Sequence, residues 1–332
     1  MPIKVAVIGA GSWGTTVAAL AAVNTPTVLW ARRPELAAAI RRDRVNGDYL
    51  PGARLPDELA ATDSLAEALG DADLVVMAVP SHGYRSVVVD AARHIRAGVP
   101  VVSLAKGIEA HSLMRMTEVT LDVMPGRPVA VLTGPNLARE ILAGQPAASV
   151  VAVEDPAVAA ELQRVFGRRT MRIYTNPDVV GCEVGGAAKN VIAIAAGMAT
   201  GMGFGDNTRA SLVTRGLAEM TRLGLAMGAK VSTFAGLAGI GDLIATCASP
   251  QSRNTTVGAE LGRGRPIDEI VASMTMVAEG VKSSPSVLAL AHRYGVDMPI
   301  TEQVVAVCHD GRTAADALDA LLRREHRSEF DH

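Results

Sequence analysis

The sequence predicts an α/β protein with a parallel-sheet domain at its N-terminus and an all-α domain at its C-terminus. From residue 3 to about residue 174, short apolar runs alternate with longer amphipathic stretches, which is typical of strands flanked by helices. After Asn176-Pro177, long stretches of Ala, Leu and Met with helical periodicity replace them. A chain of 332 residues also exceeds the size at which a single core usually stops growing. We therefore expect two domains, residues 1–180 and 181–332, with the boundary near 178–182.

The individual elements follow from these patterns in chain order. Short apolar runs predict strands at residues 4–8, 27–30, 74–79, 101–104, 129–132, 149–153 and 172–174. Amphipathic stretches between them predict helices at residues 15–22, 34–42, 64–69, 84–93 and 156–166. The second half predicts helices at about 178–200, 207–227, 233–236, 240–248, 254–262, 267–273, 279–292, 298–307 and 313–326.

Composition and charge exclude several classes of protein. Lys and Arg number 32 against 34 Asp and Glu, a net charge of −2, so nothing draws the chain onto nucleic acid or an anionic membrane. The three cysteines, Cys182, Cys247 and Cys308, are far apart and form no C-x-x-C pair, which argues against a disulfide framework or a metal site. The N-terminus lacks a cleavable signal pattern. We expect a compact protein of the reducing cytoplasm with no bound metal.

One segment, residues 183–202, is apolar enough to suggest a membrane span. Its four strongly hydrophobic residues contribute only about −0.3 to −0.6 kcal/mol each, whereas Lys189 near its middle costs about +2.5 to +3.5 kcal/mol. Glu183 and Asn190 add to that cost. We therefore expect a buried core helix and no membrane span.

A glycine-rich loop directly follows the first predicted strand and opens the first helix. In Gly9-Ala10-Gly11-Ser12-Trp13-Gly14, the first glycine permits the tight turn and the second lets backbone amides approach a pyrophosphate. The third lets the helix pack on the strand, and the helix N-terminus favours the phosphate charge. The alternative is a merely glycine-rich turn. The context favours a Rossmann-type dinucleotide-binding domain.

The end of the second predicted strand indicates which dinucleotide is bound. A site that prefers NAD usually carries an acidic residue there, but this chain has Arg32 and Arg33. An arginine attracts the 2′-phosphate of NADPH by a charge-assisted contact. The alternative is a pair of solvated surface arginines. We expect NADP(H) to be preferred, with NAD(H) possible.

Polar residues follow two further predicted strands. Lys106 comes after the strand at 101–104, and Gly134 and Asn136 follow the strand at 129–132. Ligands of open α/β sheets bind beyond the carboxyl ends of the strands, so these residues are candidates to contact a small polar ligand. For Lys106 the alternative is an ordinary solvated loop lysine.

The second half contains a lysine in unusual surroundings. Lys189 lies in an almost uncharged, small-residue stretch from Val184 to Gly197, and burial disfavours the charged form of an ammonium, which makes it usable as a proton donor or acceptor. A carboxylate close to it would act in the opposite direction, so the sequence leaves its pKa open. The alternative is a lysine that snorkels out of a core helix.

Downstream, residues 237–254 place several polar groups between glycines. Asp242, Thr246 and the run Ser252-Arg253-Asn254 are the candidates for binding there. Ser252 or Asn254 could simply cap the following helix, and that role is compatible with binding a phosphate beside an arginine.

Together these motifs resemble the signature set of bacterial-type NAD(P)-dependent sn-glycerol-3-phosphate dehydrogenases. The match runs in order over nearly the whole chain: the glycine loop, Lys106-Gly107, Gly134-Pro135, Lys189-Asn190, and Gly241-Asp242-Leu243 with Thr246-Cys247 and Ser252-Arg253-Asn254. The resemblance implies reversible hydride transfer between NAD(P)H and dihydroxyacetone phosphate, giving sn-glycerol 3-phosphate for phospholipid synthesis. It also implies a homodimer.

The resemblance assigns roles to individual residues, with Lys189 as the proton donor to the carbonyl oxygen. The substrate-binding residues that it implies are Lys106, Gly134, Asn136, Lys189, Asn190, Asp242, Thr246, Ser252, Arg253 and Asn254. The cofactor-binding residues that it implies are Gly9, Gly11, Ser12, Trp13, Gly14, Arg32, Arg33, Lys106, Ala138, Arg253, Val277 and Glu279. The chain departs from the family at Asn136-Leu137, where a small hydroxyl residue and Phe are usual.

Two other functions remain open from the sequence. An enzyme of the wider 3-hydroxyacid dehydrogenase type, which includes 6-phosphogluconate dehydrogenases, shares the glycine loop, a helical second domain and a lysine. The cluster Ser252-Arg253-Asn254 favours the triose phosphate over that alternative. A catalytically silent NADPH-binding sensor would keep the first domain but would need no lysine in the second.

Overall fold

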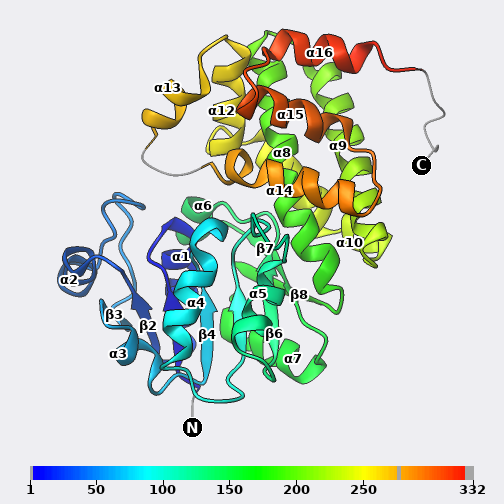
Figure 1. Ribbon diagram of the computed structural model, residues 1–332. Helices are drawn as coiled ribbons and strands as arrows, with labels where there is room; N and C mark the ends of the chain where they lie inside the picture. Colours follow the sequence, from blue (N-terminus) through cyan, green and yellow to red (C-terminus); the bar gives the residue numbers. More distant parts are fainter. Residues whose placement is uncertain (1–2, 275–277, 326–332) are drawn as a thin grey trace. The chain divides into compact units, whose positions relative to one another are not determined.

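The computed structural model describes residues 3–274 and 278–325, which form two compact units (Figure 1). The sheet unit comprises Met1–Lys106 and Met114–Val179. The helical unit comprises Gly107–Leu113 and Val180–His332, so a short segment from the first half of the chain belongs to the helical unit.

The sheet unit is built on an eight-stranded sheet with the strand order β3-β2-β1-β4-β5-β6-β7-β8. The strands are β1 (Val5–Ile8), β2 (Thr27–Trp30), β3 (Leu59–Thr62), β4 (Leu74–Met77), β5 (Val101–Ser103), β6 (Val129–Thr133), β7 (Ala147–Ala152) and β8 (Met171–Asn176). Every neighbouring pair is parallel except β6 and β7, which are antiparallel. The order reverses at β1, which pairs with both β2 and β4. All seven predicted strands are present, and β3 is an additional one.

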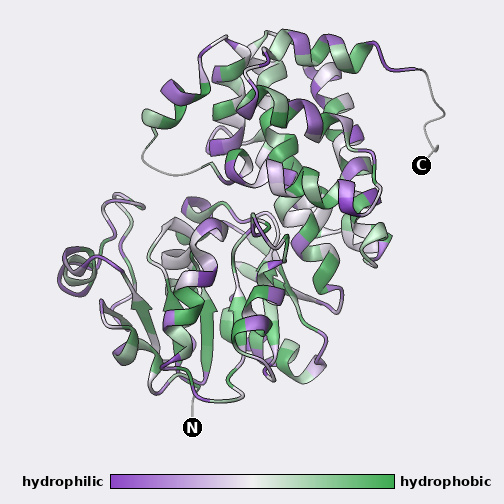
Figure 2. Ribbon diagram, in the orientation of Figure 1, coloured by the Kyte–Doolittle hydropathy of each residue, from purple (hydrophilic) through white to green (hydrophobic). Residues whose placement is uncertain are grey.

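Helices cover both faces of this sheet. They are α1 (Ser12–Ala22), α2 (Pro34–Asp43), α3 (Leu65–Leu69), the 3₁₀ turn η1 (Ser81–Gly83), α4 (Tyr84–Ala92), α5 (Met116–Val123), α6 (Ala138–Leu142) and α7 (Pro156–Phe166). Alternate residues of β1 serve the two faces, because Val5 and Val7 pack in one core cluster and Ala6 and Ile8 in another. Burial on both faces explains why central strands such as β1 and β4 are continuous apolar runs, and Figure 2 shows the strands of this part of the sheet in the hydrophobic colour.

The helical unit is organised around one long helix, α8. Its helices are α8 (Val179–Gly201), α9 (Asp206–Ala226), α10 (Val231–Phe234), the π-helical turn η2 (Leu237–Gly241), α11 (Asp242–Ala248), α12 (Arg253–Gly262), α13 (Ile267–Ala272), α14 (Glu279–Arg293), α15 (Pro299–His309) and α16 (Ala314–Leu322). Every residue of α8 from Gly181 to Ala199 is buried. Helix α12 packs directly on the α8 backbone, since a Cβ at Gly258 would lie 2.1 Å from the Ile194 oxygen.

Two segments of this unit are long and apolar enough to cross a membrane by length and composition alone. They are Val179–Gly201 and Val231–Ala248. In the first, 89% of the apolar window is buried inside the unit, as expected for the core helix of a folded domain. The second is divided into α10, η2 and α11.

Candidate active site

The glycine loop between β1 and α1 has the geometry that a dinucleotide needs. Gly9 has a φ of 120°, and a Cβ there would lie 2.5 Å from the oxygen of Ala78. A Cβ at Gly14 would lie 2.1 Å from the oxygen of Gly9, so the first and third glycines are required by packing. Beside Gly11 there is open space, and Gly11 caps α1 without a side-chain hydrogen bond. The loop therefore leaves room and helix-terminal amides for a pyrophosphate.

The two arginines after β2 differ in their surroundings. Both are exposed, but Arg33 forms an ion pair with Asp48, and this hydrogen bond raises the pKa of Arg33. Within residues 3–274 and 278–325, we find no hydrogen bond or ion pair that engages Arg32. Arg32 is thus the better placed of the two to bind a 2′-phosphate, because its charge is not offset by a neighbouring carboxylate.

The remaining predicted residues of the sheet unit lie at the carboxyl ends of β5 and β6. The Lys106 ammonium donates to the Gly134 oxygen at 3.0 Å. The Asn136 Oδ1 accepts a hydrogen bond from Ser149 on β7. Ala138, the first residue of α6, accepts from Thr16 of α1 at 3.3 Å, which places the start of α6 beside the helix that the glycine loop opens. The loops after β1, β2, β5 and β6 thus carry the candidate ligand contacts of this unit.

Lys189 is buried in the helical unit and held by two residues of α11. Its Nζ donates to Asp242 Oδ1 at 2.8 Å and to Thr246 Oγ1 at 2.6 Å. The side chains of Lys189 and Asp242 are only 7% and 2% exposed. The turn η2 presents Asp242 as the first residue of α11, and such π-helical turns are frequent at functional sites.

The ammonium of Lys189 retains a donor. It has three N–H groups, and two have partners; for the third, none is found in the described part of the chain. Cys247, next along α11, is no competing reactive group, because burial raises the pKa of its thiol to about 12. Lys189 therefore keeps one N–H donor available to a ligand.

A second polar network connects α8, α12 and α14. Asn254 Nδ2 donates to Asn190 Oδ1 at 2.9 Å, and the Gly280 amide donates to Asn254 Oδ1 at 2.9 Å. Ser252 caps α12 by accepting from the Thr255 amide, as its position before the helix suggested.

Arg253 and Glu279 lie near this network. Partial burial lowers the pKa of Arg253, and the negative charge of Glu279 acts in the opposite direction. Arg253 still exposes part of its surface to solvent, at the first position of α12. Val277, which the sequence analysis also selected, lies outside the described residues.

Both halves of the chain match models of one family. Residues 4–159 match the N-terminal model of NAD-dependent glycerol-3-phosphate dehydrogenase, and residues 178–319 match its C-terminal model. The chain belongs to the NAD-dependent glycerol-3-phosphate dehydrogenase family.

Individual relatives agree with this family. The chain is 59% identical over 323 residues to the NAD(P)+ glycerol-3-phosphate dehydrogenase 2 of Sphingopyxis alaskensis, covering 97% of both. It is 53% identical over 331 residues to the NAD(P)+ enzyme of Streptomyces coelicolor, covering 99% of this chain and 98% of the relative. The crystal structure of the Coxiella burnetii enzyme is 34% identical with a TM-score of 0.93, over 97% of this chain and 99% of that one.

These findings confirm the fold class, a Rossmann-type sheet domain followed by a helical domain, and the family that the motifs indicate. They also favour an enzyme of this family over the hydroxyacid dehydrogenase and sensor alternatives. A ketopantoate reductase from Ralstonia eutropha, 15% identical with a TM-score of 0.60, shares the fold alone.

In the sheet unit the predicted residues lie in the glycine loop and after β2, β5 and β6. In the helical unit the described ones lie around Lys189 and around Asn254. Ser149 and Gly280 were not among the predicted residues, because their contacts depend on segments that are brought together by folding. In the described part of the chain, no group of three or more His, Cys, Asp or Glu side chains is arranged to hold a metal ion.

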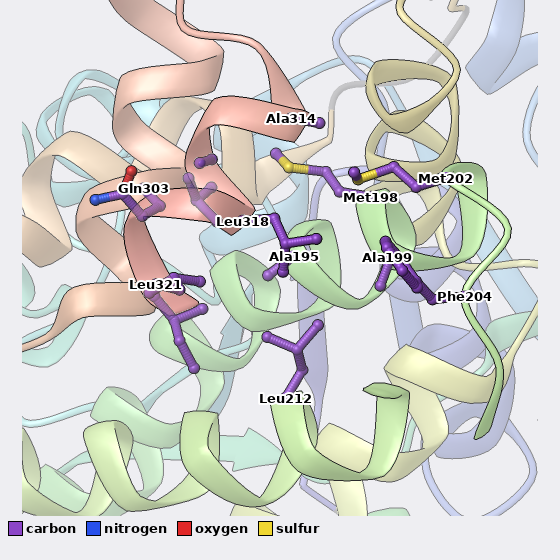
Figure 3. Close-up of a pocket in the computed structure, with 13 residues that line it drawn as sticks. Ala195, Met198, Ala199, Met202, Phe204, Leu212, Gln303, Ala314, Leu318 and Leu321 are labelled. Atoms are coloured by element: carbon purple, nitrogen blue, oxygen red, sulfur yellow. The ribbon is translucent and has the colours of Figure 1, made fainter. Parts of the chain in front are cut away.

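The helical unit also has an apolar pocket (Figure 3). Its empty space is about 400 Å³, part of which is open to solvent. Side chains of α8, of the turn after it and of α9, α15 and α16 line it, among them Met198, Met202 and Leu321, with Gln303 as a polar member. None of the predicted site residues lines it. A phosphorylated substrate needs hydrogen-bond donors, so this apolar pocket is not a suitable site for it.

Proposed function

We propose that this chain catalyses the reversible transfer of a hydride between NAD(P)H and dihydroxyacetone phosphate, giving sn-glycerol 3-phosphate for glycerophospholipid synthesis. Its family membership and the relatives named for NAD(P)+ support this reaction. The observation that carries the mechanism is the buried Lys189 ammonium, which Asp242 and Thr246 hold with one N–H to spare.

Reduction of the ketone requires a hydride, which the nicotinamide supplies when the dinucleotide is bound. The oxygen of the ketone then gains negative charge, and Lys189 stabilises that charge and donates a proton to the oxygen. In the reverse direction Lys189 accepts the proton. Asp242 and Thr246 fix the direction of the Nζ atom, so little reorganisation is needed during the reaction.

Dinucleotide binding is assigned to the sheet unit. The loop from Gly9 to Gly14 binds the pyrophosphate, and Arg32 binds the 2′-phosphate of NADP(H). NAD(H) lacks that phosphate but makes the other contacts, so both cofactors are used and NADP(H) is preferred. Arg33 contributes less because Asp48 offsets its charge.

Substrate binding is assigned to Arg253 and Asn254 for the phosphate, with Asn190 as a further polar contact. Lys106, Gly134 and Asn136 are the candidate substrate contacts of the sheet unit. The domain roles follow: residues 1–180 bind the dinucleotide and residues 181–332 carry the proton donor. A homodimer acting in the cytoplasm completes the proposal.

An assay with purified protein tests this function. The parent is expected to oxidise NADPH when dihydroxyacetone phosphate is added. Lys189→Met is expected to bind NADPH with the parent's affinity, while turnover falls by roughly 10²- to 10⁴-fold, the usual contribution of a general acid. Lys282→Met, at an exposed lysine of α14, is the control and should retain full activity.

The outcomes separate two errors. A parent without activity on this substrate would contradict the proposed reaction. An active Lys189→Met variant would instead contradict the role of Lys189 alone. Thermal melting of each variant shows that it is folded before its rate is interpreted.

A further inference from the structure

Asn136 lies in a turn that is tightly fixed against β7. The turn connects β6 to α6. Strand β7 runs antiparallel to β6, and Thr133 at the end of β6 is paired with Val150 of β7. Gly134 has a φ of 123°, and a Cβ there would lie 3.3 Å from the Ser149 Cα. The turn is held from a second direction by Lys106, whose Nζ donates to the Gly134 oxygen at 3.0 Å.

Ser149 determines which way the Asn136 amide faces. Ser149 is fully buried, and its hydroxyl donates to Asn136 Oδ1. If the amide were turned round, Nδ2 would donate to the serine oxygen and the serine O–H would lose the acceptor that it now has, so the observed orientation is the one that keeps this O–H bonded. The Nδ2 end of Asn136 therefore faces away from Ser149.

This Nδ2 atom is a donor without an acceptor. It is buried, and no hydrogen-bond partner is found for it in the described part of the protein. A buried polar group without a partner is unfavourable, which points to an acceptor supplied by a ligand. The turn follows the carboxyl end of β6, just as Lys106 follows the carboxyl end of β5. In open α/β sheets ligands bind beyond the carboxyl ends of the strands.

We propose that Ser149 is a positioning residue: it orients Asn136 so that the amide Nδ2 donates to an oxygen of the phosphorylated substrate. This inference rests on the proposed function. A hydroxyl side chain at this position could rotate and could donate or accept. The amide of Asn136 is fixed by Ser149 and offers only a donor, so its partner is an oxygen that accepts.

A double-mutant cycle tests whether Ser149 acts through Asn136. The variants are Ser149→Ala, Asn136→Ala and the double variant. The dissociation constant of sn-glycerol 3-phosphate is measured calorimetrically with NADPH present, because these two reduced compounds cannot react with each other. KM and kcat for dihydroxyacetone phosphate are measured alongside. NADPH affinity and thermal melting are recorded for each protein.

Ser149→Ala alone is expected to weaken substrate binding about fivefold, as loss of one oriented hydrogen bond does, with kcat and NADPH affinity nearly unchanged. In the Asn136→Ala background it is expected to have no further effect on substrate binding. Ser149→Thr, which keeps the hydroxyl, should restore binding to within about twofold of the parent.

Two results overturn the inference. Equal weakening by Ser149→Ala in both backgrounds means that Ser149 has only a structural role, and no weakening in either means that it does not orient the amide. A parent that neither binds sn-glycerol 3-phosphate nor reduces dihydroxyacetone phosphate overturns the proposed function, and this inference with it. The parent measurements therefore distinguish the two failures.

Discussion

Glu219 is expected to make the helical unit less stable as the pH rises through the neutral range. This carboxyl on α9 is 1% exposed and accepts hydrogen bonds from the amides of Ile300 and Thr301, at the N-terminus of α15, and from the Thr301 hydroxyl. Burial raises its pKa from 4.5 to about 7, although those hydrogen bonds and the charge of Arg222 act in the opposite direction.

The sign and size of the effect follow from proton linkage. Between pH 4.5 and about 7 the unfolded chain releases a proton that the folded chain still holds, so the free energy of unfolding falls as the pH rises through this window. At about 1.4 kcal/mol per pH unit, the loss from this one group reaches about 3 kcal/mol. Below pH 4.5 the contribution is fully present.

The comparison is between the parent and Glu219→Gln, which is neutral at every pH and still offers an acceptor to the Ile300 amide. The parent's free energy of unfolding minus that of the variant is expected to fall by about 3 kcal/mol from pH 4.5 to pH 8. Glu302→Gln, at an exposed carboxyl in the first turn of α15, is the control and should show little pH dependence.

The assay must report on the helical unit. Both tryptophans of the chain, Trp13 and Trp30, lie in the sheet unit, so their fluorescence does not follow this transition. Hydrogen exchange of peptides from α15, measured at increasing urea concentrations, follows the unfolding of the helical unit. A difference between parent and Glu219→Gln that stays flat or rises with pH would refute the reasoning, because it would mean that the hydrogen bonds keep the carboxyl ionised.

Two further predictions concern charged side chains. Arg32→Ala is expected to raise the KM for NADPH by about 10- to 100-fold, the value of a charge-assisted hydrogen bond, and to leave the KM for NADH unchanged. Arg33→Ala should raise the KM for NADPH less. Equal increases in KM for both cofactors in Arg32→Ala would contradict the assignment of Arg32. Asp242→Ala is expected to lower the unfolding free energy of the helical unit by about 3–5 kcal/mol, because it leaves the Lys189 ammonium buried without its carboxylate. Both free energies are measured by hydrogen exchange in increasing urea. Asp268→Ala, at an exposed carboxylate of α13, is the control and should change the unfolding free energy by about 0.5 kcal/mol or less. An Asp242→Ala variant as stable as the parent would show that the ion pair contributes nothing.

Patterns that are local in the chain were predictable from the sequence. The glycine loop has its three glycines within six residues, and the strand before it and the helix after it are both apolar enough to identify. Strand β3 was not predicted, because Leu59-Ala60-Ala61-Thr62 has no distinctive pattern and becomes a strand through its pairing with β2. Helices α5 and α6 have only eight and five residues, too few for a clear helical periodicity, and they were not predicted.

The site shows the same limit. Lys189 and Asp242 could each be selected from their neighbours, but the 2.8 Å contact between them joins residues 53 positions apart and comes from the packing of α11 on α8. Ser149 gave no local signal at all. Its partner Asn136 is 13 positions away, and only the antiparallel placement of β7 beside β6 brings the two side chains together.

The segment Gly107–Leu113 has a consequence for how the protein is made. Ile108 is 4% exposed and packs in the core of the helical unit, whose other residues begin at Val180. A ribosome adds roughly 5–20 residues per second, so the 67 residues from 113 to 180 take about 3–13 s to synthesise. During that interval the helices against which Ile108 and Leu113 pack have not yet been synthesised, so the core of the helical unit can form only after Val180 and the residues beyond it are made.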